Sequence, residues 1–130
     1  MAIALAFCFS LLILFSVKAF AETDSACFTY RLLSNEAIEI RRCHSEAAEV
    51  IVPEQIDGYT VVGIGARAFY ESETLTSVLL PESVEYIGKK AFCGCECLSR
   101  LSLPRRLKRI GSRAFTCCYR LSEIHFPGSQ

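Results

Sequence analysis

The apolar positions of this chain follow a pattern that returns every 23 residues. The hexamer Ile-Gly-x-x-Ala-Phe occurs at residues 64–69, again at 87–92 and again at 110–115. A fixed period in this range is the mark of a repeat architecture, in which each unit is one structural module. The sequence therefore predicts a solenoid built from stacked coils.

Each repeat also contains a predicted strand that ends at a proline. These strands cover 75–81, 98–104 and 121–127, and the first strand that leads into a repeat is 50–53. A single unit has too few apolar residues for a core, so stacking must supply it. We expect Pro to end each strand and Gly after Ile to permit a tight bend. The predicted internal columns are Leu75/Leu98/Leu121, Val78/Leu101/Ile124, Leu80/Leu103/Phe126, Ile64/Ile87/Ile110 and Phe69/Phe92/Phe115.

Residues 27–43 have the alternation of a β-hairpin with a turn at 34–36. A register centred on Asn35 pairs Tyr30 with Ile40 and Leu32 with Ile38, and it sets Arg31 against Glu39. The same register places Cys27 opposite Cys43, which predicts a disulfide in an oxidising compartment; a slipped register would leave both unpaired. A second, smaller hairpin is expected in the inserted segment 54–63, around Asp57-Gly58.

The first 21 residues differ in kind from the rest. An apolar run from Ala2 to Val17 is followed by Ala19-Phe20-Ala21, a small-residue cleavage site typical of a secretory signal peptide. The alternative is an uncleaved membrane anchor, although the run is short for a bilayer span. The predicted organisation is a signal peptide at 1–21, an N-terminal β-hairpin cap at 22–49 and repeats at 50–130, about three units plus a final strand.

These motifs resemble the BspA-type leucine-rich repeats of secreted and surface proteins, over residues 28–127. The resemblance rests on Phe28-Thr29-Tyr30, on the lead-in 57–61, and on Leu-Pro followed by Ile-Gly-x-x-Ala-Phe. It implies a repeat solenoid, a right-handed leucine-rich repeat coil that is mostly β with short helical or 3-10 turns. It also implies a parallel sheet on one face and a role in binding proteins or surfaces, including adhesion. Known members usually have more units, so we expect either a fragment of a longer protein or an open end that acts as an interface.

Charge is balanced overall but divided along the chain. Residues 22–88 contain 4 basic and 12 acidic side chains, whereas residues 89–130 contain 9 basic and 2 acidic ones. Such asymmetry indicates a charged partner or head-to-tail self-association. A basic patch is expected on turns, where it could meet an anionic glycan, a membrane surface, nucleic acid or the acidic part of a neighbour; its members are Lys89, Lys90, Arg105, Arg106, Lys108, Arg109 and Arg113.

Five cysteines cluster after the Ala-Phe pairs. Cys95 and Cys118 each follow the Phe by three residues, and we interpret them as small packing residues. Cys93, Cys97 and Cys117 are additional and could form disulfides between coils. A zinc site is disfavoured because the C-x-C-x-C spacing is not that of structural zinc sites. No HExxH, GxSxG or phosphate-loop motif is present, so we predict no enzyme, no cofactor and no metal.

The best candidate for binding is the outer face of the repeat strands. Aligned on the proline, the outward positions are Glu49, Ile51, Ser77, Leu79, Arg100, Ser102, Glu123 and His125. This mixture of apolar and charged side chains suits a protein interface. The sequence thus predicts a secreted or cell-surface binding module for a protein or glycan on a host or neighbouring cell, with no nucleic acid partner and no membrane span after cleavage. The alternatives are a structural unit that docks its acidic end on the basic end of another copy, and a thiol- or metal-based enzyme.

Overall fold

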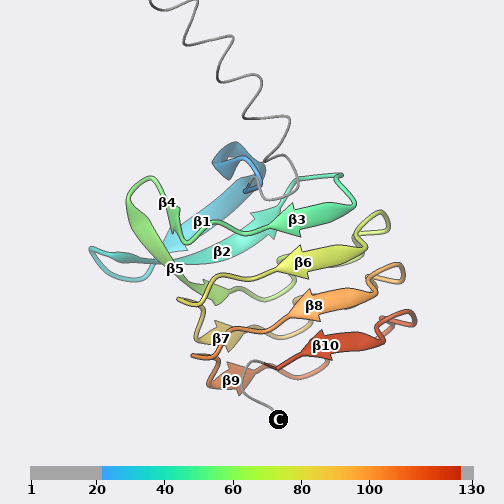
Figure 1. Cartoon of the computed structure of the whole chain (residues 1–130). Helices are drawn as coiled ribbons and strands as arrows, with labels where there is room; N and C mark the ends of the chain where they lie inside the picture. The colour runs from blue at the N-terminus through green and yellow to red at the C-terminus, as the bar shows by residue number, and fades with distance from the viewer. Residues whose placement is uncertain (1–21, 127–130) are drawn as a thin grey trace, which may run out of the picture.

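The computed structural model describes residues 22–126, which form a solenoid of about four turns with two sheets facing each other (Figure 1). One sheet, which we call sheet B, contains a single strand from each coil, and all neighbours in it are parallel. Its strands are β3 (Glu49–Ile51), β6 (Ser77–Leu79), β8 (Arg100–Ser102) and β10 (Glu123–His125). The predicted signal peptide lies outside the described residues.

The opposite sheet, sheet A, joins the N-terminal hairpin to the repeats. Its strand order is β1-β2-β5-β7-β9, and β4 pairs with β5 as an extra antiparallel strand. Because β2 runs parallel to β5, the hairpin continues the stack and covers its first coil. The strands are β1 (Phe28–Leu32), β2 (Ala37–Cys43), β4 (Gln55–Ile56), β5 (Tyr59–Ile64), β7 (Tyr86–Ile87) and β9 (Arg109–Ile110).

The hairpin register is confirmed at its tip and wrong at its base. Tyr30 pairs with Ile40 and Leu32 with Ile38, as predicted, but the register shifts between Thr29 and Tyr30. Because of this bulge, Phe28 rather than Cys27 lies opposite Cys43. Pattern reasoning assumes a regular ladder, and one extra residue on one strand displaces every later pair. The inserted hairpin β4–β5 is confirmed: Asp57 and Gly58 both have positive φ, as a tight two-residue turn requires.

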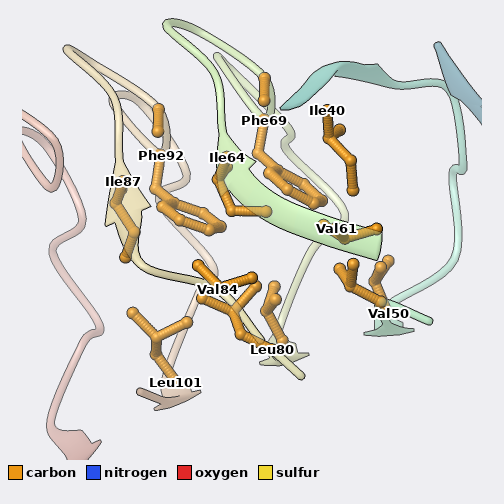
Figure 2. Close-up of a cluster of buried hydrophobic side chains, with 14 of the residues drawn as sticks. Ile40, Val50, Val61, Ile64, Phe69, Leu80, Val84, Ile87, Phe92 and Leu101 are labelled. Carbon is orange, nitrogen blue, oxygen red and sulfur yellow. The ribbon is translucent and has the colours of Figure 1, made fainter. Parts of the chain in front are cut away.

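The core lies between the two sheets (Figure 2). It contains the first two members of every predicted column, together with residues outside the columns such as Ile40 and Val61. Phe69 and Phe92 are fully buried, with stacked rings whose centroids are 4.9 Å apart, and Phe92 stacks on Phe115 at 5.6 Å. Burial decreases toward the last described coil, where Ile110 and Ile124 are 45% and 38% exposed. The first two members of each column are therefore buried as predicted, whereas the third members are only partly buried or are exposed.

The Ala-Phe segments form successive hydrogen-bonded turns and not the short helical or 3-10 turns that the resemblance implies. In one coil, Ala91 N donates to Gly88 O and Cys93 N donates to Lys90 O, both at 3.2 Å. Lys90 has a left-handed backbone with φ of 56°, which interrupts any right-handed helix. The only helix in residues 22–126 is the 3-10 segment η2 (Ser25–Cys27).

The glycine that follows the repeated isoleucine allows neighbouring coils to stack closely. A Cβ at Gly88 would come within 2.6 Å of Ala66 N, and one at Gly111 within 2.5 Å of Lys89 N. Neither glycine has a positive φ. Glycine is therefore needed because the backbone of the preceding coil passes too near for any side chain.

Candidate binding surface

The outer face of sheet B carries a groove of about 420 Å³. In-register pairing of parallel strands aligns the outward side chains of successive coils in two columns. All eight predicted outward residues line this groove, together with Val50, Val78 and Leu101. The structure thus brings together on one surface residues that are up to 76 positions apart, from Glu49 to His125.

Charged and apolar side chains lie in separate columns of the groove. Arg100 Nη2 lies 3.7 Å from Glu49 Oε1, and Glu123 is the strand neighbour of Arg100 on the other side. In the second column Leu79 is 46% exposed and Ile51 is half-buried. The groove therefore combines an acid–base–acid row with an apolar strip, and both remain accessible for contact.

The residues of the predicted basic patch lie near the short strands β7 and β9, some before a strand and some after it. Arg105 and Arg106 lie in the turn before β9, where Arg105 N donates to Glu82 Oε2 at 3.1 Å. Lys89, Lys90 and Arg113 lie in the turns after β7 and β9.

Two members of the patch, Lys108 and Arg109, have partners within the chain. Lys108 Nζ lies 3.2 Å from Glu85 Oε2, and the Arg109 guanidinium lies 5.2 Å from the centroid of the Tyr86 ring.

A polar row across the outer face of sheet A was not predicted as a unit. It runs through Arg31, Glu39, Gly63, Tyr86 and Arg109, which pair with one another from β1 to β9. Tyr86 Oη donates to Glu39 Oε2 at 2.6 Å, and Arg31 and Arg41 lie 3.2 and 3.5 Å from Glu39 Oε1. Burial, and then the hydrogen bond to Glu39, raise the pKa of Tyr86. This row ties the hairpin cap to the repeats.

Gly63 makes the row possible. A Cβ at Gly63 would lie 2.1 Å from Tyr86 Cζ, so the tyrosine ring occupies the space that a side chain would need. The sequence did carry a signal: Gly63 stands at the repeat position that Tyr86 and Arg109 occupy in the following coils. A small residue at a position that is large in the other coils can mark a crossing side chain.

The clustered cysteines separate into two kinds. Cys95 is fully buried and its Sγ donates to Phe69 O at 2.9 Å, while Cys118 Sγ donates to Phe92 O at 3.0 Å. Burial raises the pKa of the Cys95 thiol to about 12 and raises that of Cys118 as well. Cys93, Cys97 and Cys117 are half-buried free thiols. Within residues 22–126, no three or more His, Cys, Asp or Glu side chains are arranged to hold a metal ion.

Cys27 and Cys43 are also free thiols in the structure. His44 N donates to Cys27 O at 2.7 Å, so the two segments are adjacent. Cys43 and His44 line a separate polar pocket of about 370 Å³. Burial raises the pKa of Cys43, the opposite of what an activated thiolate requires. The groove that contains His125 has no cysteine in its lining.

Among the described residues, no helix has the length and apolar character needed to cross a membrane. No protein of curated function matches the sequence significantly.

Comparison with solved structures gives bacterial leucine-rich repeat proteins. The chain is 41% identical to a leucine-rich repeat protein of T. pallidum, with a TM-score of 0.79 over 82% of this chain and 50% of that one. It is 31% identical to a leucine rich cell surface protein from Faecalibacterium prausnitzii, with a TM-score of 0.72 over 81% and 30% of the two chains. A leucine-rich repeat protein from Bacteroides ovatus is 29% identical, with a TM-score of 0.69 over 77% and 28%. The chain thus spans half the length of the first of these proteins and a smaller share of the length of the other two.

The model of the BspA type leucine rich repeat region matches residues 59–130. This range is more than half of the chain, and it contains all three Ile-Gly-x-x-Ala-Phe hexamers. The match agrees with the solenoid geometry and with the solved relatives. The chain belongs to the BspA-type leucine-rich repeat family.

Proposed function

We propose that this protein is an exported, non-catalytic binding module that holds a segment of a protein ligand in the groove on sheet B. The observation that supports the proposal is the groove itself, where exposed Leu79 lies beside the Arg100–Glu49 pair. An apolar anchor surrounded by charged groups is the usual composition of a protein interface. Export is proposed from the apolar run at residues 1–21 and from the similarity to a cell surface protein.

The test is binding of the protein to a panel of purified extracellular proteins, measured by surface plasmon resonance. The variant L79D/R100E should weaken binding of a retained ligand by about tenfold or more, because it places a charge in the apolar strip and reverses the central cation. The control L32D changes another exposed leucine, 55% exposed on the hairpin, and should have no effect. Retention of no protein, or equal loss in both variants, would exclude the groove as the binding site.

A second candidate function is self-assembly, in which the acidic part of one copy docks on the basic part of another. The observation that favours it is the direction of the charge division. Because the coils stack in chain order, residues 22–88 place their excess of acids toward one end and residues 89–126 place their excess of bases toward the other. Light scattering at low and high salt tests this candidate. A monomer under both conditions would contradict it.

We also propose that Cys27 and Cys43 form a disulfide when the protein is exported. The supporting observation is that His44 N donates to Cys27 O at 2.7 Å, which holds the segments of the two cysteines side by side. A link between these residues would fasten the base of the hairpin cap. Peptide mapping under non-reducing conditions should recover the linked pair from exported protein, and recovery of both cysteines as free thiols would contradict the proposal.

A further inference from the structure

Three cationic residues occupy the same place in three consecutive coils. Arg67, Lys90 and Arg113 each lie in the turn that follows a strand of sheet A, and each has a left-handed backbone, with φ of 59°, 56° and 58°. Arg67 N donates to Lys89 O and Lys90 N donates to Ser112 O, both at 3.1 Å, which holds the turns in register. The three side chains thus start from one line parallel to the solenoid axis, spaced by roughly the 4.8 Å between neighbouring strands. We call them the cation column.

This arrangement is unfavourable for folding in two ways. Residues with a Cβ adopt the left-handed conformation reluctantly, and glycine or asparagine would adopt it more easily. Like charges at neighbouring positions also repel each other. Each coil nevertheless carries a long cation there.

No carboxylate within the described range neutralises the column. The ion pairs among residues 22–126 involve the cations of Arg31, Arg41, Arg100 and Lys108, and none involves the column. Glu71 lies four residues after Arg67, but it is placed against Tyr70 and Gly94. The charge of the column is therefore available to an external anion.

Neighbouring cations add to the positive charge of the cation column, and the nearby aromatic rings limit the classes of anion that it can bind. Lys89 is exposed beside Lys90, and Arg109 lies on the adjoining face of sheet A. The rings of Tyr70 and Tyr86 are already occupied, because Arg67 lies over Tyr70 at 5.6 Å and Arg109 over Tyr86 at 5.2 Å. Single-stranded nucleic acid binds by stacking its bases on free aromatic rings, so these rings are poorly suited to it.

We infer that the cation column binds a linear acidic polysaccharide, one with sulfate or carboxylate groups, laid along the solenoid axis. An extended polymer with regularly repeated anions matches a straight row of cations, and arginine can hold sulfate or carboxylate with two parallel hydrogen bonds. This surface lies on the turns after sheet A and is separate from the groove on sheet B. The inference therefore stands independently of the ligand proposed for that groove.

The test uses heparin as the probe and calorimetry as the readout. The variant R67N/K90N/R113N removes the column with the residue that tolerates a left-handed backbone best, so it should unfold at the same temperature or higher. Heparin affinity should fall by about tenfold or more, and its dependence on salt should become weaker. The control R105N/R106N/R120N removes the same charge from exposed positions elsewhere and should change affinity by less than about threefold.

The possible outcomes separate cleanly. Equal losses in both triple variants would mean unspecific attraction to net charge, and failure of the unchanged protein to bind heparin would exclude the site; either overturns the inference. A single-stranded oligonucleotide or vesicles of anionic lipid that bind as tightly as heparin, with the same sensitivity to the column, would overturn the assignment to a polysaccharide. If the triple variant does not fold, the single variants decide, and each should weaken heparin binding by about twofold.

Discussion

The hydrogen bond between Tyr86 and Glu39 offers a matched test of how burial sets the energetics of this solenoid. Tyr86 Oη donates to Glu39 Oε2 at 2.6 Å, and Glu39 is only 6% exposed. The chain contains the same chemistry at the same distance in an exposed place, where Tyr30 Oη donates to Asp57 Oδ2 at 2.6 Å. The two substitutions Tyr86→Phe and Tyr30→Phe remove the same atom from two different environments.

The expected costs differ because water can replace only one of the two donors. Hydrogen bonds to charged groups contribute about 1.5–3 kcal/mol, and a buried acceptor that loses its donor also loses solvation. Glu39 keeps its contacts with Arg31 and Arg41 through the other oxygen. We therefore expect Tyr86→Phe to lower the free energy of unfolding by about 2 kcal/mol. At the exposed site water solvates Asp57 in the variant, so Tyr30→Phe should cause no measurable change.

Urea denaturation followed by circular dichroism measures both variants. A domain of this size has a total stability of about 5–15 kcal/mol, so a loss of about 2 kcal/mol is resolved as a clear shift of the midpoint. The slope of the transition should be the same in all three proteins, because neither substitution changes the surface exposed on unfolding. Equal losses in the two variants, or no loss in Tyr86→Phe, would refute the reasoning that burial makes this bond important.

Three further predictions concern the same scaffold. Gly63→Ala should lower the free energy of unfolding by about 1–3 kcal/mol, because the added methyl group displaces the Tyr86 ring. In a Tyr86→Ala background the same change should cost almost nothing, and an undiminished cost would contradict the crossing of Tyr86 over Gly63. Because the folded-state pKa of Tyr86 is raised above 10.0, its unfolded form loses the proton first, so stability present below pH 10 should be lost as pH rises further; alkaline denaturation should be shallower in Tyr86→Phe than in the unchanged protein. Phe92→Leu removes two ring contacts and Phe115→Leu one, at about 0.5–1.5 kcal/mol each, so thermal unfolding should show about twice the loss for Phe92→Leu.

The repeat period was enough to predict the coils, the core columns and the outward positions of sheet B. These features depend on local alternation and on a constant spacing, both of which are visible in one sequence. The position of Leu79 beside Arg100, for example, follows from aligning the strands on their prolines. The same reasoning predicted the turn at Asp57-Gly58, because a two-residue hairpin has a strong local signature.

Features that depend on irregularity were missed. The bulge near Thr29 moved Cys43 opposite Phe28, and nothing in the alternating pattern of the hairpin indicates an extra residue. The contact of Tyr86 with Glu39 passes over an intervening strand, so pairing rules between neighbours cannot find it. The left-handed conformation of Lys90 was also unexpected, because lysine does not favour it.

The polar row on sheet A has a consequence for the order in which the molecule opens. In a solenoid each coil normally contacts only its neighbours, so either end can fray independently. Tyr86 instead reaches past β5 to Glu39, and it couples the hairpin cap to a coil that is not adjacent to it. Opening the capped end must break this long-range bond, whereas opening of the last described coil breaks only contacts with the coil before it. Native-state hydrogen exchange should therefore show that protection of the backbone amides rises from β9 and β10 toward β2 and β5. The described coils would then open first on the side of β9 and β10.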